Sequence, residues 1–228
     1  MSIRGFVPDD ADALYDVCLR TGADGSDARE LFSDPRLLGS VYVGPYVTLE
    51  PERAFVLDDG SGRAGGYVLG ALDTARFARA CEREWWPGLR ARYPLGAGTG
   101  TAIGMATGTG TRTGSPRSAD AEVIALIHDP PVADTAVLRS FPSHLHIDLL
   151  PAWQGTGWGR RLLTRLLVEL TAAGSPGVHL EVSPTNVRAI GFYGRLGFVR
   201  LPIPGDGFTM GRVLVDHGYP SRDVGPTS

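Results

Sequence analysis

The chain has 228 residues, of which 43% are hydrophobic, and a formal net charge of −3. This length and hydrophobic content suit one globular domain, or one domain with an insertion. The slightly acidic balance argues against a nucleic-acid partner and a membrane-surface partner, since such proteins usually carry a basic patch. All 22 basic residues are arginine. Mechanisms that need a lysine of this chain are therefore excluded, among them a Schiff base and a P-loop lysine.

Cysteine usage and the N-terminal segment bear on the compartment. Cys18 and Cys81 form no C-x-x-C pair, so a thiolate zinc site or a redox motif is not expected. Two distant cysteines fit buried thiols in a reducing environment. The N-terminal segment MSIRGFVPDDADAL has no apolar core of a signal peptide, and no run approaches the roughly 20 apolar residues of a membrane-spanning helix. The sequence therefore predicts a cytoplasmic protein with no membrane partner.

β-Favouring runs and helical spacing of apolar residues alternate along the first half of the chain. The predicted elements are a strand at 2–7, a helix from 9 to about 20, loop and short helix at 21–47, a hairpin of strands 53–59 and 64–73, and a helix at 74–92. Asp9 and Asp10 offer N-caps for the first helix. Pro87 is expected to break or kink the last one, because proline removes a helical hydrogen bond.

The second half begins with a Gly/Thr-rich segment, 95–117, which is predicted to be an insertion with no fixed structure of its own. Ser118 is expected to cap a short helix. The elements that follow are a strand at 144–150, a helix at 158–173, a strand at 178–182, a helix at 185–196, strands at 197–201 and 208–215, and a tail at 216–228. A right-handed crossover predicts that strands 144–150 and 178–182 are parallel neighbours in a mixed α/β fold.

The segment AWQGTGWGRRLL, residues 152–163, puts three glycines at the start of the predicted helix at 158–173. A Walker A loop needs a lysine and fails. A dinucleotide fingerprint needs G-x-G-x-x-G, and here the third glycine comes one residue early. Glu181 lies where a ribose-binding acid would stand, so a nucleotide-binding α/β domain stays open as an alternative. However, such a fingerprint normally opens its domain.

The third interpretation is Q-x-x-G-x-G as a cradle for a pyrophosphate. Small residues let an anion approach the backbone, and the helix N-terminus supplies converging N–H groups and partial positive charge. The residues of this predicted cradle are Gln154, Gly155, Thr156, Gly157, Trp158, Gly159 and Arg160. Arg161 either adds charge at the rim or belongs to a solvated helix face.

A second motif lies downstream, where residues 186–198 read N-x-x-A-x-x-F-Y-x-x-x-G-F. Together the two motifs resemble the GNAT superfamily of acetyl-CoA-dependent acetyltransferases. The resemblance implies one GNAT domain over 1–215, built on a mixed β-sheet of about six or seven strands flanked by helices. It implies acetyl-CoA as co-substrate, no metal, and pantetheine held between splayed strands 145–150 and 178–182. The implied contacts are backbone groups near Leu149 and Leu150 and the side chain of Asn186.

Stretches such as FVLDD and GGYVLG, spread over most of residues 2–215, are similar to the acetyltransferase-like C-terminal domain of eukaryotic O-GlcNAcases. In those relatives the cofactor loop is degraded. This chain keeps an intact Q-x-x-G-x-G, which favours a working cofactor site. We expect the domain to stand alone, without a glycoside hydrolase in front.

In GNAT enzymes the amine attacks the thioester directly, so an acid and a base are needed. Tyr193 occupies the family's usual acid position, and its ordinary pKa of about 10 lies near the roughly 8.5 of a thiol. A core aromatic is the alternative role. His144, His146 and Asp148 share one strand face. Asp148 is the favoured base or amine-orienting group and His146 the alternative. A zinc site of these three, or a satisfied polar network, also stays open.

The predicted activity is acetyl transfer to a primary amine of a small molecule, protein or peptide. A GNAT-like binding module without turnover is the alternative, and the oligomeric state is not indicated. Trp85, Trp86 and Tyr93 either line an acceptor pocket or pack a helix onto the sheet. Glu181 is interpreted as structural support.

Overall fold

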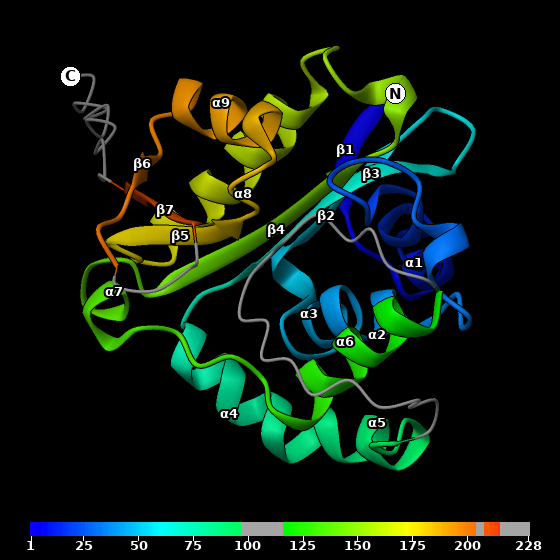
Figure 1. Cartoon of the computed structure of the whole chain (residues 1–228). Coiled ribbons are helices and arrows are strands. Elements are labelled where there is room, and N and C mark those ends of the chain that lie inside the picture. The colour runs from blue at the N-terminus through cyan, green and yellow to red at the C-terminus, as the bar shows by residue number, and fades with distance from the viewer. Residues whose placement is uncertain (97–115, 204–207, 215–228) are drawn as a thin grey trace, which may run out of the picture.

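The computed structural model describes residues 1–96, 116–203 and 208–214 (Figure 1). Its strands are β1 Ser2–Gly5, β2 Ala54–Asp58, β3 Ala64–Ala71, β4 Ser143–Leu149, β5 Gly177–Val182, β6 Val199–Arg200 and β7 Phe208–Val213. Within these residues they form one seven-stranded sheet in the order β1-β2-β3-β4-β5-β7-β6. Neighbours are antiparallel except β4 and β5, which are parallel as predicted. The mixed sheet flanked by helices confirms the predicted fold class.

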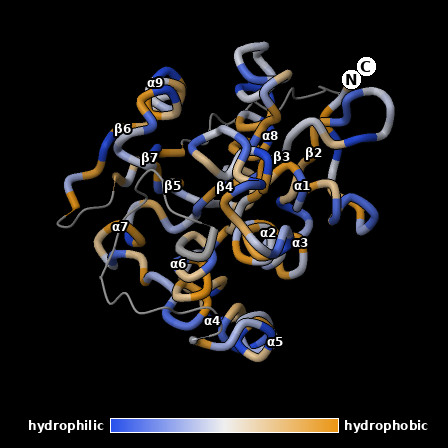
Figure 2. Tube along the Cα trace, turned by 45° about the vertical axis from the view of Figure 1, so that its right-hand side comes forward, coloured by the Kyte–Doolittle hydropathy of each residue, from blue (hydrophilic) through white to orange (hydrophobic). Residues whose placement is uncertain are grey.

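Helices cover both faces of this sheet. They are α1 Ala11–Thr21, α2 Leu37–Tyr42, α3 Gly44–Leu49, α4 Thr74–Glu84, α5 Trp86–Arg92, α6 Pro116–His128, α7 Thr135–Ser140, α8 Trp158–Ala172 and α9 Val187–Arg195. The tube view shows α8 and α9 away from the layer that contains α2 to α6 (Figure 2). Because both faces are covered, all of β3 is buried.

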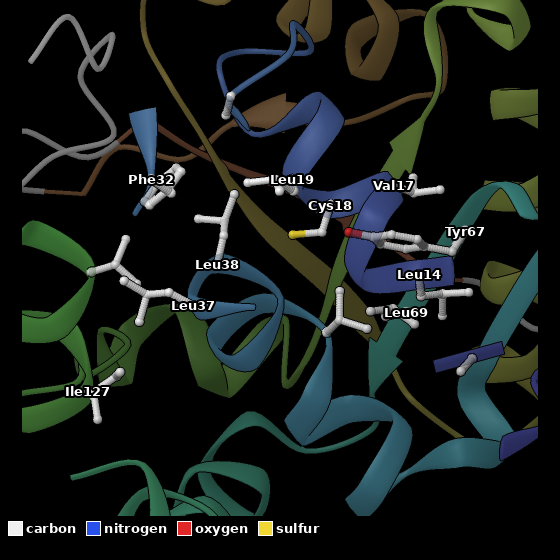
Figure 3. Close-up of a cluster of buried hydrophobic side chains, with 14 of the residues drawn as sticks. Leu14, Val17, Cys18, Leu19, Phe32, Leu37, Leu38, Tyr67, Leu69 and Ile127 are labelled. Carbon is white, nitrogen blue, oxygen red and sulfur yellow. The ribbon is translucent and has the colours of Figure 1, made fainter. Parts of the chain in front are cut away.

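The alternation of side chains along the strands divides the interior into two cores. On β3, Tyr67 and Leu69 point into a core with α1, α2, α4, α5 and α6, which we call the α1 core (Figure 3). Val68 points to the opposite side, into the α8 core that α8 and α9 close. The α8 core contains the leucine stripe of α8, namely Leu162, Leu163, Leu166, Leu167 and Leu170.

The first helix is capped differently from the prediction. Asp10 occupies the N-cap position of α1, but its side chain makes no cap hydrogen bond to that helix. Its carboxylate instead takes two hydrogen bonds of 2.7 Å from the Arg4 guanidinium and one of 2.9 Å from Val7 N. A bidentate arginine pair is stronger than a neutral cap bond, so Asp10 ties the turn after β1 to β1 itself.

The structure confirms some of the other predicted helix and strand boundaries and corrects others. The helix at 74–92 breaks as predicted into α4 and α5, with Trp85 between them and Pro87 in the first turn of α5. The helix assigned to a Ser118 cap begins earlier, at Pro116. The strand predicted at 197–201 is only two residues long, and α7 was not predicted. Six-residue helices such as α7 carry too few apolar positions for a helical period to show.

Residues 97–115, 204–207 and 215–228 are outside the described part of the chain. Nearly all of the predicted insertion at 95–117 and the whole predicted tail at 216–228 fall on them. The limits of the predicted domain, 1–215, therefore stay a prediction. In the described part, no helix combines the length and the apolar character that crossing a bilayer requires.

Candidate functional site

The two parallel strands separate soon after they begin. β4 and β5 are paired only at Ser143 with Val178 and at His144 with His179. Towards their carboxyl ends the strands have no further pairing with each other, while β3 and β7 cover their outer sides along the whole length. The sheet therefore opens at its centre, at the end where ligands bind in α/β folds.

Backbone groups of β4 face this opening. Leu150 N donates to Gly65 O on the β3 side at 3.0 Å. Along a strand, the backbone N–H and C=O groups of successive residues point to opposite neighbouring strands. The groups of Ile147 and Leu149 therefore point towards β5 instead of β3. Of the two residues predicted to pair with pantetheine, the structure places the amide of Leu149 in the opening and that of Leu150 on β3.

The glycine segment lies at the mouth of the opening. Gly155 and Gly157 have φ of 74° and 90°, a region that favours glycine, and a Cβ at either would meet nothing within 4 Å. Gly157 is the N-cap of α8 and supplies no side-chain cap, so the first N–H groups of α8 point out of the helix uncapped. Partial positive charge collects there. Thr156 Oγ1 closes the turn by donating to Trp153 O at 2.6 Å.

The side chain of Gln154 points into the protein and not towards the predicted phosphate position. Its Nε2 donates to Leu149 O at 2.8 Å and to Gly25 O at 3.2 Å. The neighbouring Asp24 Oδ2 accepts from Thr185 Oγ1 at 3.4 Å. The turn after α1 therefore contacts the loops that follow both β4 and β5. On the β4 side, this contact is the hydrogen bond from Gln154 to Gly25.

Gly159 permits a close approach of three elements. A Cβ there would lie 3.3 Å from the Phe192 ring on α9 and 3.5 Å from Leu149 on β4. The guanidinium of Arg161 stacks at 4.6 Å over the ring of Trp158, so Arg161 is committed to that contact. Arg160 is exposed at the first turn of α8.

The second motif builds α9. Asn186 Oδ1 accepts from Ala189 N at 3.0 Å and caps that helix. Tyr193 is 9% exposed, and its ring contacts those of Phe192 and Phe198. Its hydroxyl has no hydrogen-bond partner within the described residues. Burial raises the pKa of Tyr193, and the negative charge of Asp148 raises it further, so the phenol stays protonated at neutral pH.

On the α1 side of β4, two of the three predicted polar residues meet. His146 Nε2 donates to Asp148 Oδ2 at 2.9 Å, and Tyr67 Oη donates to the same oxygen at 2.6 Å. The Tyr42 ring stacks on His146 with centroids 5.6 Å apart. Asp148 Oδ1 has no hydrogen-bond partner in the described part of the chain. This oxygen is therefore available to a further donor.

His144 has a different environment. Its Nδ1 lies 2.7 Å from Thr74 Oγ1, and its ring packs against those of Tyr46, Phe77 and His179. Burial lowers the pKa of His144 to about 3, and the neighbouring His179 contributes in the same direction. His144 is therefore neutral and packed. The zinc triad of His144, His146 and Asp148 is not assembled.

Sequence reasoning missed two residues near this face. Tyr67 and Cys18 lie beside Asp148 on the side of the α1 core, and no local pattern singles them out. Glu181 is exposed on β5, on the face that carries His179, and makes no hydrogen bond or ion pair with the described residues. Desolvation raises the pKa of its carboxyl. The sequence had singled out Glu181 as structural support, and strand alternation from the paired His144 and His179 sets the face on which it lies.

Trp85, Trp86 and Tyr93, which lie at the ends of α5, pack inside the protein rather than line an opening. Trp85 Nε1 donates to Ser40 O at 2.9 Å, and Tyr93 Oη donates to Asp34 Oδ2 at 2.7 Å. Trp86 and Tyr93 are each 8% exposed in the α1 core. The packing interpretation therefore holds for this group.

Three comparisons place the chain among known proteins. Residues 71–198 match the acetyltransferase (GNAT) family. The solved structure "Crystal structure of SsHAT" has a TM-score of 0.80 and 39% identity, and the match covers 94% of this chain and 98% of that one. Naa20 from Chaetomium thermophilum, solved with a bisubstrate analogue, has a TM-score of 0.51 and 19% identity over 94% of this chain and 87% of that one, and shows the fold alone.

Among curated proteins, Protein O-GlcNAcase of Rattus norvegicus is 28% identical over 219 residues. The match covers 93% of this chain but 22% of the rat protein. The mouse protein matches to the same extent. This chain thus corresponds to less than a quarter of those relatives. The similarity to O-GlcNAcases noted in the sequence is confirmed.

Proposed function

This chain belongs to the acetyltransferase (GNAT) family, and from that premise we propose that it transfers the acetyl group of acetyl-CoA to a primary amine. The observation that carries the proposal is the opening between β4 and β5, with the uncapped N-terminus of α8 at its mouth. An unpaired strand edge can hydrogen-bond an extended amide chain such as pantetheine. A helix N-terminus behind a glycine turn binds phosphate.

The residues present fit this co-substrate. The open space in front of Gly155 and Gly157 is what a pyrophosphate would need to reach the backbone N–H groups from Gly155 to Arg160. The amide of Leu149 would bind pantetheine. Gln154 and Asn186 support the site indirectly in our proposal, because their side-chain oxygens and nitrogens already hold the loop and cap α9. When bound, acetyl-CoA supplies the reactive thioester.

His146 and Asp148 act together as the base in this proposal. Since His146 donates from Nε2 to Asp148, its neutral ring has an unprotonated Nδ1 that can accept a proton from the amine. The Asp148 carboxylate orients the ring and stabilises the imidazolium that forms, and its Oδ1 can hold the incoming ammonium. Tyr193 remains protonated and can donate its proton to the leaving thiolate.

Binding of acetyl-CoA to the wild-type chain, measured by calorimetry, tests the site. We expect Gly157→Glu to abolish binding, because it puts negative charge at the phosphate position. Gly62→Glu is the matched control: Gly62 has φ of 84° in the β2–β3 turn, also with nothing within 4 Å, so the backbone strain is equal but the location is remote. Equal affinity of the two variants would refute the loop assignment.

Turnover separates the enzyme from a binding module, the alternative that the similarity to O-GlcNAcases supports. Pooled small amines and peptides are screened for release of CoA. Acceptor-dependent release that Asp148→Asn removes would establish the transferase. Acetyl-CoA binding without release from any amine would favour the binding module.

A further inference from the structure

One group of metal-ligating side chains stands out in the described residues, and it differs from the His144, His146 and Asp148 alternative that the sequence left open. The ligand atoms of Cys18, His146 and Asp148 all lie within 4.8 Å of one another. Cys18 comes from α1, and His146 and Asp148 come from β4. Thiolate, imidazole and carboxylate together form a donor set that suits Zn²⁺.

The spacing is close to that of a coordinated ion. Zinc bonds of about 2.0–2.3 Å in a tetrahedron place the ligand atoms roughly 3.3–3.6 Å apart. His146 Nε2 and Asp148 Oδ2 are 2.9 Å apart across their hydrogen bond. A metal ion replaces the proton of that bond, so the two atoms need to separate by only a few tenths of an ångström. Cys18 needs a side-chain adjustment on the order of 1 Å.

The position of Cys18 is fixed by the α1 core. Its side chain is 2% exposed and lies among Leu14, Val17 and Leu38. Figure 3 shows the hydroxyl of Tyr67 directed towards Cys18, whose sulfur lies on the side of Leu38. In this position the sulfur lies within 4.8 Å of the ligand atoms of His146 and Asp148.

An ion has a route to this group from the opposite side. The side chains of His146 and Asp148 are 31% and 18% exposed, so the imidazole and carboxylate reach solvent while the thiol lies beneath them. The site would thus be closed at its base by Cys18 and open at its top. The fourth zinc position would remain for water or for the Tyr67 oxygen.

We propose that Cys18, His146 and Asp148 form a binding site for Zn²⁺, and that Zn²⁺ bound there inhibits acetyl transfer. On binding, the Cys18 thiol loses its proton to solvent and a zinc–sulfur bond forms. The proton on His146 Nε2 moves through solvent to Nδ1, so the ring stays neutral while a zinc–nitrogen bond forms at Nε2. The proposed inhibition rests on the proposed function, because the ion would occupy His146 and Asp148, which act there as the general base. The proposed binding of Zn²⁺ does not depend on that function.

Titration with Co²⁺, a spectroscopic substitute for Zn²⁺, tests binding without acetyl-CoA. We expect the wild-type chain to give the visible bands of tetrahedral cobalt and a near-ultraviolet thiolate-to-cobalt band, both abolished by added Zn²⁺. Cys18→Ser should remove the thiolate band and weaken the affinity for Co²⁺ by more than the roughly 10–100-fold that loss of a partner outside the ligand set causes. Circular dichroism verifies that each variant is folded.

Cys81 provides the matched control. It is the other buried cysteine, and it lies on α4 outside the group. Burial raises its pKa to about 12, so it stays a thiol at neutral pH. Cys81→Ser should keep the cobalt spectrum. Absence of a thiolate band in the wild type, or a spectrum unchanged in Cys18→Ser, would overturn the proposed site. His146→Gln gives a second check if Cys18→Ser does not fold.

Inhibition is measured by CoA release with and without Zn²⁺. We expect Zn²⁺ to inhibit the wild type and Cys81→Ser, and a chelator to restore turnover. Cys18→Ser should turn over comparably in metal-free buffer and tolerate at least tenfold more Zn²⁺. Equal zinc sensitivity of both variants would overturn the inhibitory role. A chain that binds Co²⁺ through Cys18 but shows no turnover at all would refute the proposed function and leave the zinc site standing.

Discussion

At Asp148, one carboxylate oxygen accepts hydrogen bonds from His146 on the same strand and from Tyr67 on the neighbouring strand. Tyr67 is fully buried, so without this acceptor its hydroxyl would lose about 1–3 kcal/mol of stabilisation. Burial and the charge of Asp148 raise the pKa of Tyr67, which keeps it a donor. The two donors thus hold Oδ2 of Asp148, and within the described residues Oδ1 has no hydrogen-bond partner.

The hydroxyl of Tyr193 is expected to matter for turnover and not for binding. Tyr193→Phe keeps the ring contacts with Phe192 and Phe198 but removes the proton offered to the thiolate. We expect kcat to fall by about 10²–10⁴ while the Kd of acetyl-CoA stays nearly constant. Tyr93→Phe is the control, since Tyr93 is equally buried but bonds Asp34. Equal activity of Tyr193→Phe at every pH would remove the acid role.

His144 is expected to make stability depend on acidity. Its pKa is about 3 in the folded chain and about 6.5 when unfolded, so between these values the unfolded state binds more protons. Stability from this group is fully present above about pH 6.5 and falls as pH drops towards 3, by at most about 1.4 kcal/mol per pH unit. His144→Asn, which keeps a polar atom near Thr74, should show a shallower decline in urea unfolding. Parallel declines would contradict the assignment.

Among the secondary-structure elements, α8 serves both the interior and the site. Its leucine stripe packs on the sheet, and Leu166 lies close enough to β3 that a Cβ on Gly70 would come within 2.6 Å of it. The same packing fixes where the first turn of α8 presents its N–H groups. Core packing and the proposed anion binding are therefore linked through a single rigid helix.

Truncating one leucine of the α8 stripe should therefore lower the stability of the fold. Leu166 is fully buried, and Leu166→Ala is expected to lower the free energy of unfolding by about 2–5 kcal/mol. Val168 lies on the same helix but is 58% exposed, so Val168→Ala should change it by less than about 0.5 kcal/mol. Urea titration measures both. Similar losses in the two variants would mean that α8 does not pack on β3 as described.

For the whole molecule, the sheet stays continuous across β3 to β4 and β5 to β7 but opens between β4 and β5. The turn after α1 reaches over the end of this opening through Gly25 and Asp24. Parts of the chain that are distant in sequence thus border the opening between β4 and β5. A ligand that enters between the strands would connect the α1 and α8 sides.

Acetyl-CoA should accordingly stabilise the entire fold. At a ligand concentration of about 100 times Kd, the free energy of unfolding is expected to rise by about 2.7 kcal/mol and Tm by roughly 5–10 °C. Differential scanning fluorimetry measures the shift, which Gly157→Glu should lose and Gly62→Glu should keep. A larger shift with NAD than with acetyl-CoA would instead support the nucleotide-binding alternative.

The sequence by itself determined the features that depend on neighbours along the chain. Apolar, β-favouring runs placed β3, β4 and β5, leucine spacing placed α8, and Pro87 predicted the break between α4 and α5. It also identified the glycine turn, because positive φ at Gly155 and Gly157 is a local requirement. The two motifs together sufficed to predict the fold class.

Only the tertiary structure decided which side chains meet. Gln154 was predicted as part of the cradle, but its amide bonds Gly25, which is far away in sequence. Cys18 was predicted to be a buried thiol, and α1 places its sulfur within 4.8 Å of the ligand atoms of His146 and Asp148. Asp10 bonds Arg4 across a turn instead of capping α1. Such contacts depend on how helices settle on the sheet, and that is set by packing of whole faces rather than by residue spacing.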